Sequence, residues 1–246
     1  MKLKLHWLIL ACLISFVPAR SAQEAGTSVL YDFIRTRPPY DEPQLSPQQV
    51  SKVLNAALGA GWRRRADSIS ISQIVTGSFT AANVQEVAYV IRGSGATNAQ
   101  TRIDMGNDAR LVVFSGSRVV ANAPFYGIGV LKTSDLNRDG VDELLLYAGA
   151  TGTGETVTSA EMVEVKGKRL RVIKDFGTVE SISGCYGGDE DSGGRHVTSI
   201  IRYAPAKVGA FPRFRVEFYQ CACADESEVV DPQKCRFVQA DKMPDE

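Results

Sequence analysis

The chain has 246 residues, of which 44% are hydrophobic and 23% are charged, and its formal net charge at pH 7 is zero. This composition excludes a disordered chain, because it supplies enough apolar residues for a sizeable core. Its one run of three basic residues is Arg63-Arg64-Arg65. No stripe of cations is therefore available to neutralise a phosphate backbone, and we expect no nucleic-acid partner.

The N-terminus has the pattern of a secretion signal. Lys2 and Lys4 precede an apolar run of 11 residues from Trp7 to Val17, and Ala19-Arg20-Ser21 places small residues where a signal peptidase cleaves. A spanning helix needs about 20 apolar residues, so a retained anchor is the weaker alternative and we expect no stable membrane insertion. The sequence predicts a signal peptide over residues 1–21 and a periplasmic or extracellular (secreted) protein.

One short helix is predicted within residues 22–66, after a proline-rich strap. Ser46 has the features of an N-cap, Pro47 suits the first helical position, and Gln49 completes a capping box. Gly59 stands where a C-terminal cap belongs. Between these signals, apolar residues recur at helical spacing: Val50, Val53, Leu54, Ala57 and Leu58.

Residues 67–240 have the pattern of a β domain, followed by a short tail over residues 241–246. Short runs rich in Val, Ile, Tyr and Phe alternate with Gly, Asn and Ser. Tight hairpin turns are predicted at Ser115-Gly116-Ser117 and Lys166-Gly167-Lys168. The expected strands are Ser70–Val75, Glu86–Arg92, Arg110–Phe114, Glu143–Tyr147, Ala160–Val165, Leu170–Lys174, Thr198–Tyr203 and Phe214–Tyr219.

The β domain also contains an internal repeat. A shift of 57 residues places GSFTAANVQEVAYV, which begins at Gly77, over SDLNRDGVDELLLY, which begins at Ser134, and aligns Glu86 with Glu143. A third, less regular copy is expected between about Gly184 and the Phe214 strand. The predicted fold is mainly β, with repeated antiparallel β-meanders that resemble propeller blades in a partial propeller, plugged by the one short N-terminal helix.

The second copy carries an array of oxygen ligands. Counting Asp135 as position one, side-chain oxygens fall at positions one, three, five and nine, Gly140 falls at six, and Val141 offers its carbonyl at seven. Alternate positions on a tight loop converge on one centre, and calcium takes six to eight oxygen ligands. We therefore predict a calcium site formed by Asp135, Asn137, Asp139, Val141 and Glu143.

Position twelve distinguishes this loop from an EF-hand. An EF-hand has a bidentate Glu there, whereas this chain has Leu146, within an apolar run that predicts a buried strand. The sequence DLNRDGVDELLL resembles the calcium loop of FG-GAP repeats, also called VCBS-type or integrin α-like repeats. That resemblance implies a loop between two strands of a propeller blade, with ligands at positions one, three, five and nine, and Asp142 pointing away.

The first copy departs from this pattern. It has Ser78, Thr80 and Ala82 in place of Asp135, Asn137 and Asp139, so it keeps the shape without the ligands. One calcium site is therefore expected. The alternative for the second copy is a solvated acidic turn that holds no ion.

Four cysteines follow the signal peptide: Cys185, Cys221, Cys223 and Cys235. An oxidising compartment favours disulfides, although a four-thiolate metal site or a redox-active Cys-Ala-Cys pair are alternatives. A bond between Cys221 and Cys223 is disfavoured because residues two apart on a strand cannot close without strain. We predict that Cys235 bonds to Cys221 or Cys223 and that Cys185 takes the other.

No catalytic or cofactor-binding residue is predicted. His196 is the one histidine beyond the signal peptide, it stands at the start of an apparent strand, and a surface or structural role is favoured over a catalytic one. The resemblance implies a calcium-stabilised binding module for an unknown protein or carbohydrate ligand. The alternative is an exported hydrolase or thiol redox protein that uses His196 or Cys221-Ala222-Cys223.

Overall fold

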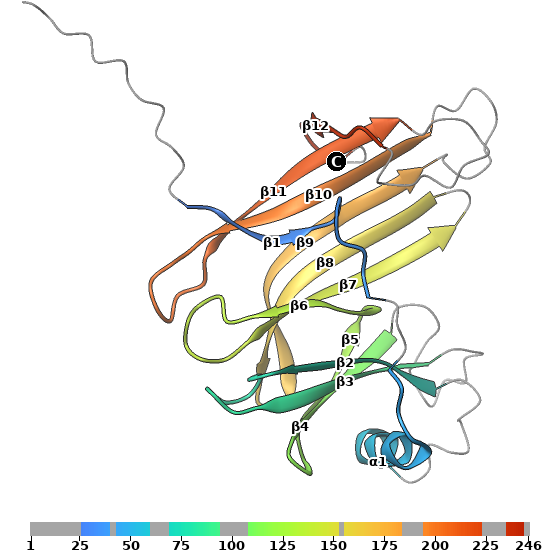
Figure 1. Ribbon diagram of the computed structural model, residues 1–246, viewed down its shortest axis with the longest axis vertical. Helices are drawn as coiled ribbons and strands as arrows, with labels where there is room; N and C mark the ends of the chain where they lie inside the picture. Colours follow the sequence, from blue (N-terminus) through green and yellow to red (C-terminus); the bar gives the residue numbers. More distant parts are fainter. Residues whose placement is uncertain are drawn as a thin grey trace, which may run out of the picture.

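A computed structural model describes residues 26–39, 43–59, 69–93, 108–152, 155–183, 194–222 and 235–243 (Figure 1). The predicted signal peptide, the three consecutive arginines, Cys185 and Cys223 lie outside these ranges. The elements are β1 (Ser28–Asp32), α1 (Pro47–Leu58), β2 (Ile69–Gly77), β3 (Glu86–Gly93), β4 (Asp108–Ser115), β5 (Arg118–Tyr126), β6 (Gly129–Ser134), β7 (Glu143–Gly152), β8 (Glu155–Lys166), β9 (Arg169–Ser183), β10 (Arg195–Ala204), β11 (Arg213–Ala222) and β12 (Val238–Ala240).

The strands form two antiparallel sheets, which confirms the predicted mainly β class. The smaller sheet has the order β2-β3-β4-β5 and is a simple meander. The larger sheet has the order β12-β11-β10-β9-β8-β7-β6, with β1 added beside β10, and it curls into a half-barrel. The third copy expected from the sequence therefore does not form a sheet of its own, because β10 and β11 continue the sheet that the second meander begins.

Three apolar clusters hold these layers together. The first lies between the two sheets and joins Ala88, Val90 and Leu111 of the smaller sheet to Leu144 and Leu146 of the larger. The second lines the inner side of the half-barrel, and the third lies between α1 and the opposite face of the smaller sheet. The smaller sheet is consequently buried on both faces, which explains the unbroken apolar runs Val87–Ile91 in β3 and Leu111–Phe114 in β4.

Strand β7 shows the same double burial within three residues. Leu144 and Leu146 belong to the cluster between the sheets, whereas Leu145 belongs to the cluster inside the half-barrel, and all three are fully buried. Successive side chains of a strand point to opposite faces, so an unbroken leucine run is what a strand between two cores requires.

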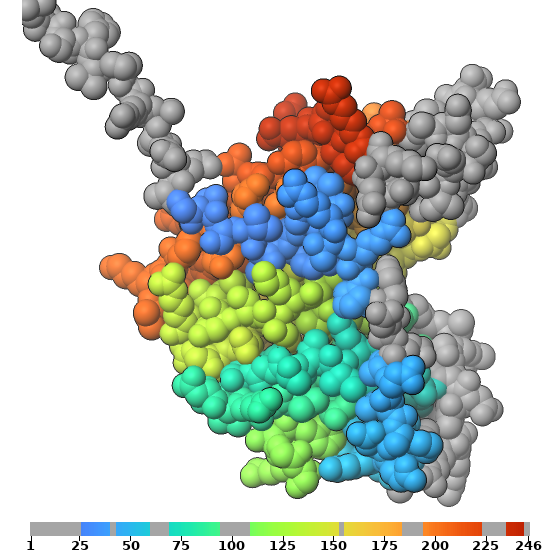
Figure 2. Space-filling model, in the orientation of Figure 1, coloured from blue at the N-terminus to red at the C-terminus, as the bar shows by residue number. Residues whose placement is uncertain are grey.

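Helix α1 covers the outer face of the smaller sheet, as Figures 1 and 2 show at the lower end of the molecule. The Ser46 side chain accepts a hydrogen bond from the Gln49 N–H, and the Gln49 side chain accepts one from the Ser46 N–H, so the predicted capping box is present. Gly59 has φ 77° and donates its N–H to the Asn55 carbonyl. Val53 and Leu54 pack against Ile91 in the third cluster, so the helix covers a sheet face and does not plug a central channel.

Strand β1 was not predicted. It pairs antiparallel with the second half of β10, with Ser28 opposite Tyr203 and Asp32 opposite Ile200. Strand β9 pairs only with the first half of β10. Strand β1 therefore pairs with the part of the β10 edge that β9 leaves unpaired. Figure 2 shows this segment lying across the face of the larger sheet. No helix in the described ranges is long and apolar enough to cross a bilayer.

The two copies of the predicted repeat share one hydrogen bond between the loop and the strand that follows it. The Glu86 carboxylate accepts the Phe79 N–H at 2.7 Å, and the Glu143 carboxylate accepts the Leu136 N–H at 2.8 Å. Both hydrogen bonds span seven residues, and they lie at equivalent positions of the two copies. Each copy therefore folds its loop back onto a buried glutamate at the start of the following strand.

The two loops share one left-handed position, and Arg138 adds a second one in the later loop alone. Asn83 in the first loop has φ 59°, and Gly140, which the repeat aligns with it, has φ 87°. Asparagine and glycine are the residues that adopt this conformation most readily. The predicted two-residue hairpin turns are also present, and their glycines, Gly116 and Gly167, have φ 59° and 62°.

Candidate functional site

The predicted calcium loop connects β6 to β7 and begins at Asp135. Two of its residues, Arg138 at φ 60° and Gly140 at φ 87°, have left-handed backbone, which makes the loop turn tightly. The Gly209 N–H donates to the Asn137 carbonyl at 2.7 Å, so the turn between β10 and β11 holds the loop from one side. Asn137 itself is buried at 4% exposure.

The side-chain oxygens at positions one, three and five turn inward onto the loop's own backbone. Asp135 accepts the N–H groups of Asp139 and Gly140 at 3.1 and 3.0 Å. Asn137 accepts the Asp139 N–H at 3.0 Å, and Asp139 accepts the Val141 N–H at 2.8 Å. Each carboxylate oxygen has two lone pairs, so these contacts fix the side chains in a concave loop and leave acceptor capacity.

Glu143, at position nine, lies under the loop and is only 1% exposed. Burial raises its pKa to about 7; the Leu136 N–H opposes this shift, and the charges of Asp139 and Asp135 add to it. A carboxylate that is buried beside two others is destabilised when it is ionised. A cation in the loop would relieve that cost.

The equivalent glutamate of the first copy has a different environment. Glu86 accepts the N–H groups of Phe79 and Thr80, both at 2.7 Å, and also the hydroxyl of Thr80. Its carboxylate is therefore satisfied by protein donors, whereas within the described residues Glu143 accepts one hydrogen bond, from Leu136. The two loops differ at position three, where Thr80 donates its N–H and hydroxyl to Glu86, whereas the Asn137 side chain donates to Asp139 at 2.9 Å.

The two loops pack directly against each other. Asp142 accepts the Ser78 N–H at 2.8 Å and donates its own N–H to the Ser78 carbonyl at 2.7 Å. The Asn83 N–H donates to the Gly140 carbonyl at 3.2 Å. A Cβ on Gly140 would lie 2.9 Å from the Ala82 Cβ, so this contact requires glycine. As expected, Asp142 points away from the candidate ligands, and it tethers the loop to the first copy.

The donor set fits a hard cation in its chemistry. All candidate ligands are oxygens, and three of them are carboxylates: Asp135, Asp139 and Glu143. In the described part of the chain, however, no three His, Cys, Asp or Glu side chains are gathered closely enough to hold a metal ion. In this conformation the carboxylates engage the loop backbone, so binding calcium would require their side chains to rotate towards a common centre.

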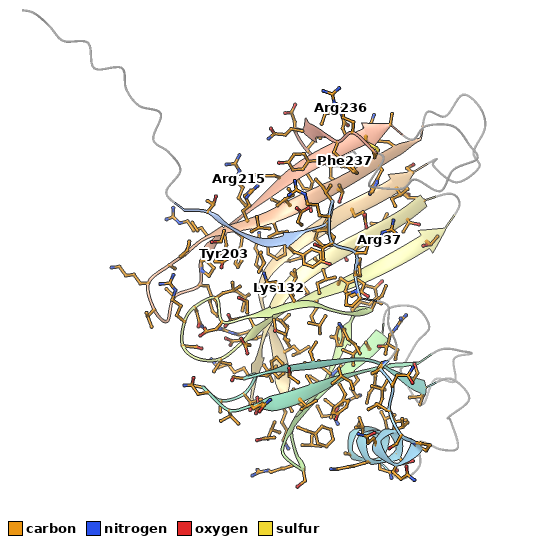
Figure 3. The ribbon with its side chains drawn as sticks, viewed as in Figure 1. Arg37, Lys132, Tyr203, Arg215, Arg236 and Phe237 are labelled. Atoms are coloured by element: carbon orange, nitrogen blue, oxygen red, sulfur yellow. A yellow bond between two sulfur atoms is a disulfide. The ribbon has the colours of Figure 1, made fainter. Side chains whose placement is uncertain are left out.

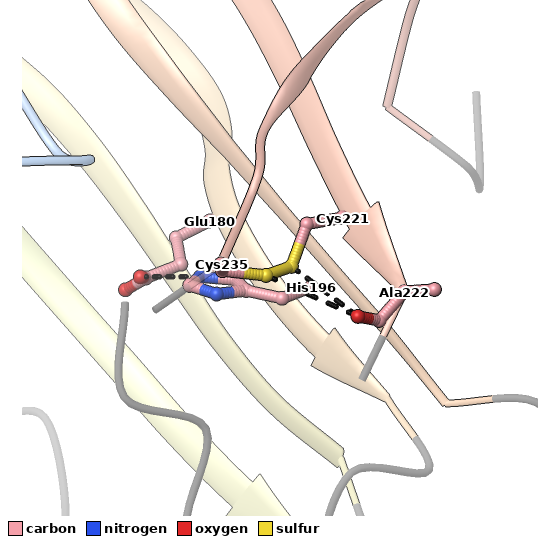
Figure 4. The surroundings of a disulfide bond; sticks show 5 residues. All are labelled: Glu180, His196, Cys221, Ala222 and Cys235. Atoms are coloured by element: carbon pink, nitrogen blue, oxygen red, sulfur yellow. Dashed lines mark hydrogen bonds and ion pairs between the residues drawn. A yellow bond between two sulfur atoms is a disulfide. The ribbon is translucent and has the colours of Figure 1, made fainter. Parts of the chain in front are cut away.

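A second cluster lies around the disulfide between Cys221 and Cys235, whose Cα atoms are 6.2 Å apart (Figure 4). The bond confirms one of the two pairings predicted for Cys235. It ties the end of β11 to the segment before β12, and it leaves Cys221 unavailable for a Cys221-Ala222-Cys223 redox pair. The remaining predicted bond involves Cys185 and Cys223, which lie outside the described residues.

His196 faces this disulfide, because it is the cross-strand partner of Cys221. It is 2% exposed, its Nε2 lies 2.9 Å from a Glu180 oxygen, and its ring packs edge-on against Phe237 at 5.2 Å. Figure 3 places Phe237 near the β12 end of the sheet. The Nδ1 atom is buried without a hydrogen-bond partner in the structure. Of the surface and structural roles that the sequence favoured, this burial fits the structural one.

Comparison with known proteins gives no relative. No family model, no curated protein and no solved structure matches the chain.

Proposed function

We propose that this chain is an exported β-repeat protein that binds one calcium ion in the loop Asp135–Glu143 and acts as a binding module. The observation that carries the proposal is the contrast between the two copies of the repeat. Both copies fold the loop back onto a buried glutamate, yet only the second places carboxylates on the inner side of its loop.

The buried glutamates support the same conclusion. Glu86 is satisfied by two backbone N–H groups and a hydroxyl, whereas Glu143 is buried beside two further carboxylates with a pKa raised to about 7. Calcium would supply the positive charge that Glu143 lacks. Asp135, Asn137 and Asp139 would give further side-chain ligands, Val141 its carbonyl, and the ion would hold the turn closed.

The disulfide supports the exported location. Bonds between cysteines persist in oxidising compartments and are rare in the cytosol, and Cys221–Cys235 stabilises the edge of the larger sheet. The resemblance of the loop to FG-GAP repeats suggests a partner among proteins or carbohydrates. In this proposal calcium has a structural role, because the ion lies where the two copies of the repeat meet.

Thermal unfolding of the purified chain with calcium or with chelator tests the proposal. Extracellular calcium modules bind with Kd values of about 10⁻⁴ to 10⁻³ M, so about 1 mM calcium should add roughly 0.4 to 1.4 kcal/mol of stability. For a chain of this size that corresponds to a rise in Tm of about 1 to 5 °C. Asp135→Ala and Asp139→Ala should abolish the rise.

Ser78→Ala is the matched control. Ser78 occupies position one of the first loop, and its contacts to Asp142 use its backbone N–H and carbonyl, so the alanine variant should keep the full calcium response. If wild-type melting is the same in millimolar calcium and in chelator, the loop is a solvated acidic turn and the proposal is wrong.

A further inference from the structure

A cleft of about 290 Å³ opens at one end of the core between the two sheets. Its walls come from the end of β5 and from the middle of β7, β8 and β9, and they include Tyr126, Leu146, Glu161, Asp175 and Gly177. The cleft uses none of the candidate calcium ligands. It is therefore a separate feature of the surface with its own chemistry.

Three of the lining residues form a row across the larger sheet. Leu146 is the cross-strand partner of Glu161, and Glu161 is the partner of Asp175. Cross-strand partners share a face, so both carboxylates lie on the face where Leu146 contributes to the core between the sheets. The apolar core thus ends in two acidic side chains, at the place where the smaller sheet stops covering the larger.

An irregularity of β9 accompanies the acidic pair. Ala160 pairs with Gly177 and Glu161 with Asp175, so β9 has one extra residue, Phe176, at this point. Gly177 has φ 63° and donates its N–H to Asp175 at 2.8 Å. A β-bulge bends its strand and redirects side chains, and such bulges are common beside binding sites. A second irregularity lies closer to the hairpin turn, where Val163 pairs with Val172 and Met162 with Lys174, and this one sets Asp175 opposite Glu161.

The acidic pair has no counter-charge in the described part of the chain. Like charges directly opposite each other on neighbouring strands destabilise a sheet. Among the described residues, neither Glu161 nor Asp175 forms an ion pair with Lys, Arg or His. Burial, and then the charge of Asp175, raises the pKa of Glu161. The fold therefore maintains a repulsion that a cationic ligand would convert into attraction.

The other residues that line the cleft favour an organic cation as the ligand. Tyr126 is 65% exposed at the cleft, and its neighbours Leu146 and Ala148 are apolar. An aromatic ring attracts organic cations, and apolar walls accept the carbon stem that carries them. We propose that this cleft binds an ammonium or guanidinium group on a short apolar stem. Glu161 and Asp175 are its acceptors, the Tyr126 ring lies beside the cation, and the apolar wall contacts the stem.

The proposal does not depend on calcium binding by the Asp135 loop. The same chemical group occurs in free amines and in lysine or arginine side chains of a protein partner. Titrations that follow the chemical shifts of backbone amides in the cleft distinguish these sources. The three probes are n-butylammonium, a blocked lysine (N-acetyl-lysine methylamide) and n-butanol. Saturable shifts with both cations, and none with the neutral n-butanol, are expected.

Tighter binding of the blocked lysine than of n-butylammonium would indicate a protein side chain as the natural ligand. Tighter binding of n-butylammonium would indicate a free amine. Either result supports a cation site. Glu161→Gln and Asp175→Asn should each weaken binding about tenfold, which corresponds to the loss of one charge-assisted hydrogen bond. Asp241→Asn, an exposed site that changes the net charge by the same amount, should have no effect.

Three results would overturn the proposal. The first is equal chemical-shift changes with n-butanol and n-butylammonium. The second is equal weakening of n-butylammonium binding by Asp241→Asn and Glu161→Gln. The third is chemical-shift changes in the cleft with calcium but not with the organic cations. Because Glu161→Gln removes a repulsion, the variant should fold and melt at or above the wild-type temperature. If the variant does not fold, the comparison of n-butylammonium with n-butanol on the wild type still decides the question.

Discussion

The side-chain amide of Gln73 is hydrogen-bonded to both backbone groups of Val130. Its nitrogen donates to the Val130 carbonyl at 2.6 Å, and its oxygen accepts the Val130 N–H at 2.7 Å. Gln73 lies on β2 and Val130 on β6, the first strands of the two copies of the repeat. One side chain thus makes the pair of bonds that a neighbouring strand would make, and it joins the edges of two sheets that share no backbone ladder.

Replacing Gln73 with Ala should destabilise the protein by about 1 to 3 kcal/mol, because it leaves a donor and an acceptor of the Val130 backbone without partners. Gln73→Glu should also destabilise, since a carboxylate cannot donate to the Val130 carbonyl. Urea unfolding measures both effects. Gln239→Ala, at an exposed position of β12, should change stability by less than about 0.5 kcal/mol. Equal effects at the two positions would contradict the bridging role.

Glu143 gives the calcium-free protein a specific pH dependence. Its pKa is about 7 in the folded chain against an ordinary value of 4.5. The folded state therefore keeps a proton that the unfolded state releases, so this group lowers stability progressively as pH rises from about 4.5 to about 7. Below that window the group has no effect, and above it the loss is complete.

Glu143→Gln should remove this loss. In chelator, the variant should match the wild type near pH 4 and exceed it by up to about 3 kcal/mol near pH 8. Chemical unfolding across this pH range measures the difference. A gap between variant and wild type that does not change with pH would show that ionisation of Glu143 is not the cause. Asp241→Asn serves again as the exposed control.

The disulfide should contribute about 3 kcal/mol to stability, as expected for a closed loop of about 15 residues. The double variant Cys221→Ala/Cys235→Ala should lose that amount. Reductant should lower the Tm of the wild type by more than it lowers the Tm of this variant, which keeps Cys185 and Cys223. Alkylation without reductant, followed by peptide mass spectrometry, should modify neither cysteine. Labelling of both in protein from an exported fraction would count against the bond.

Ser46→Ala should destabilise the protein by about 1 kcal/mol, because it removes the acceptor for the Gln49 N–H at the start of α1. Ser46→Asp should retain most of the stability, since aspartate is an equally good cap. The helix packs on the smaller sheet through Val53 and Leu54, so its loss should also expose that face. Hydrogen exchange of the β3 and β4 amides reports on this directly.

Local signals allowed the sequence to predict some elements closely. The helix cap, the two glycine hairpins and the leucine run of β7 each depend on residues within one turn or one strand, so their chemistry is readable along the chain. The 57-residue repeat was also readable, because both copies keep Glu86 and Glu143 in register. At the site, the turn itself was predictable from the Gly140 position.

Long-range pairing was not predictable in the same way. Strand β1 is short and half exposed, and its partner lies more than a hundred residues further along the chain, so nothing near Ser28 indicates it. The sequence also did not show that the third copy shares a sheet with the second, since β10 joins β9 through backbone pairing that side-chain patterns do not specify. The Glu161–Asp175 cleft was also missed, because the two residues become cross-strand partners only through an irregular pairing of β8 with β9.

The place of β1 has a consequence for how the protein folds. Its partner residues extend to Tyr203, so the half-barrel cannot be completed until a ribosome has synthesised most of the chain. Contacts between such distant segments slow folding, because loop closure must precede any gain from pairing. The meander from β2 to β5 contains only local pairings and can form earlier. Residues Ser28–Asp32, synthesised before every other strand, are therefore expected to be among the last to take their place.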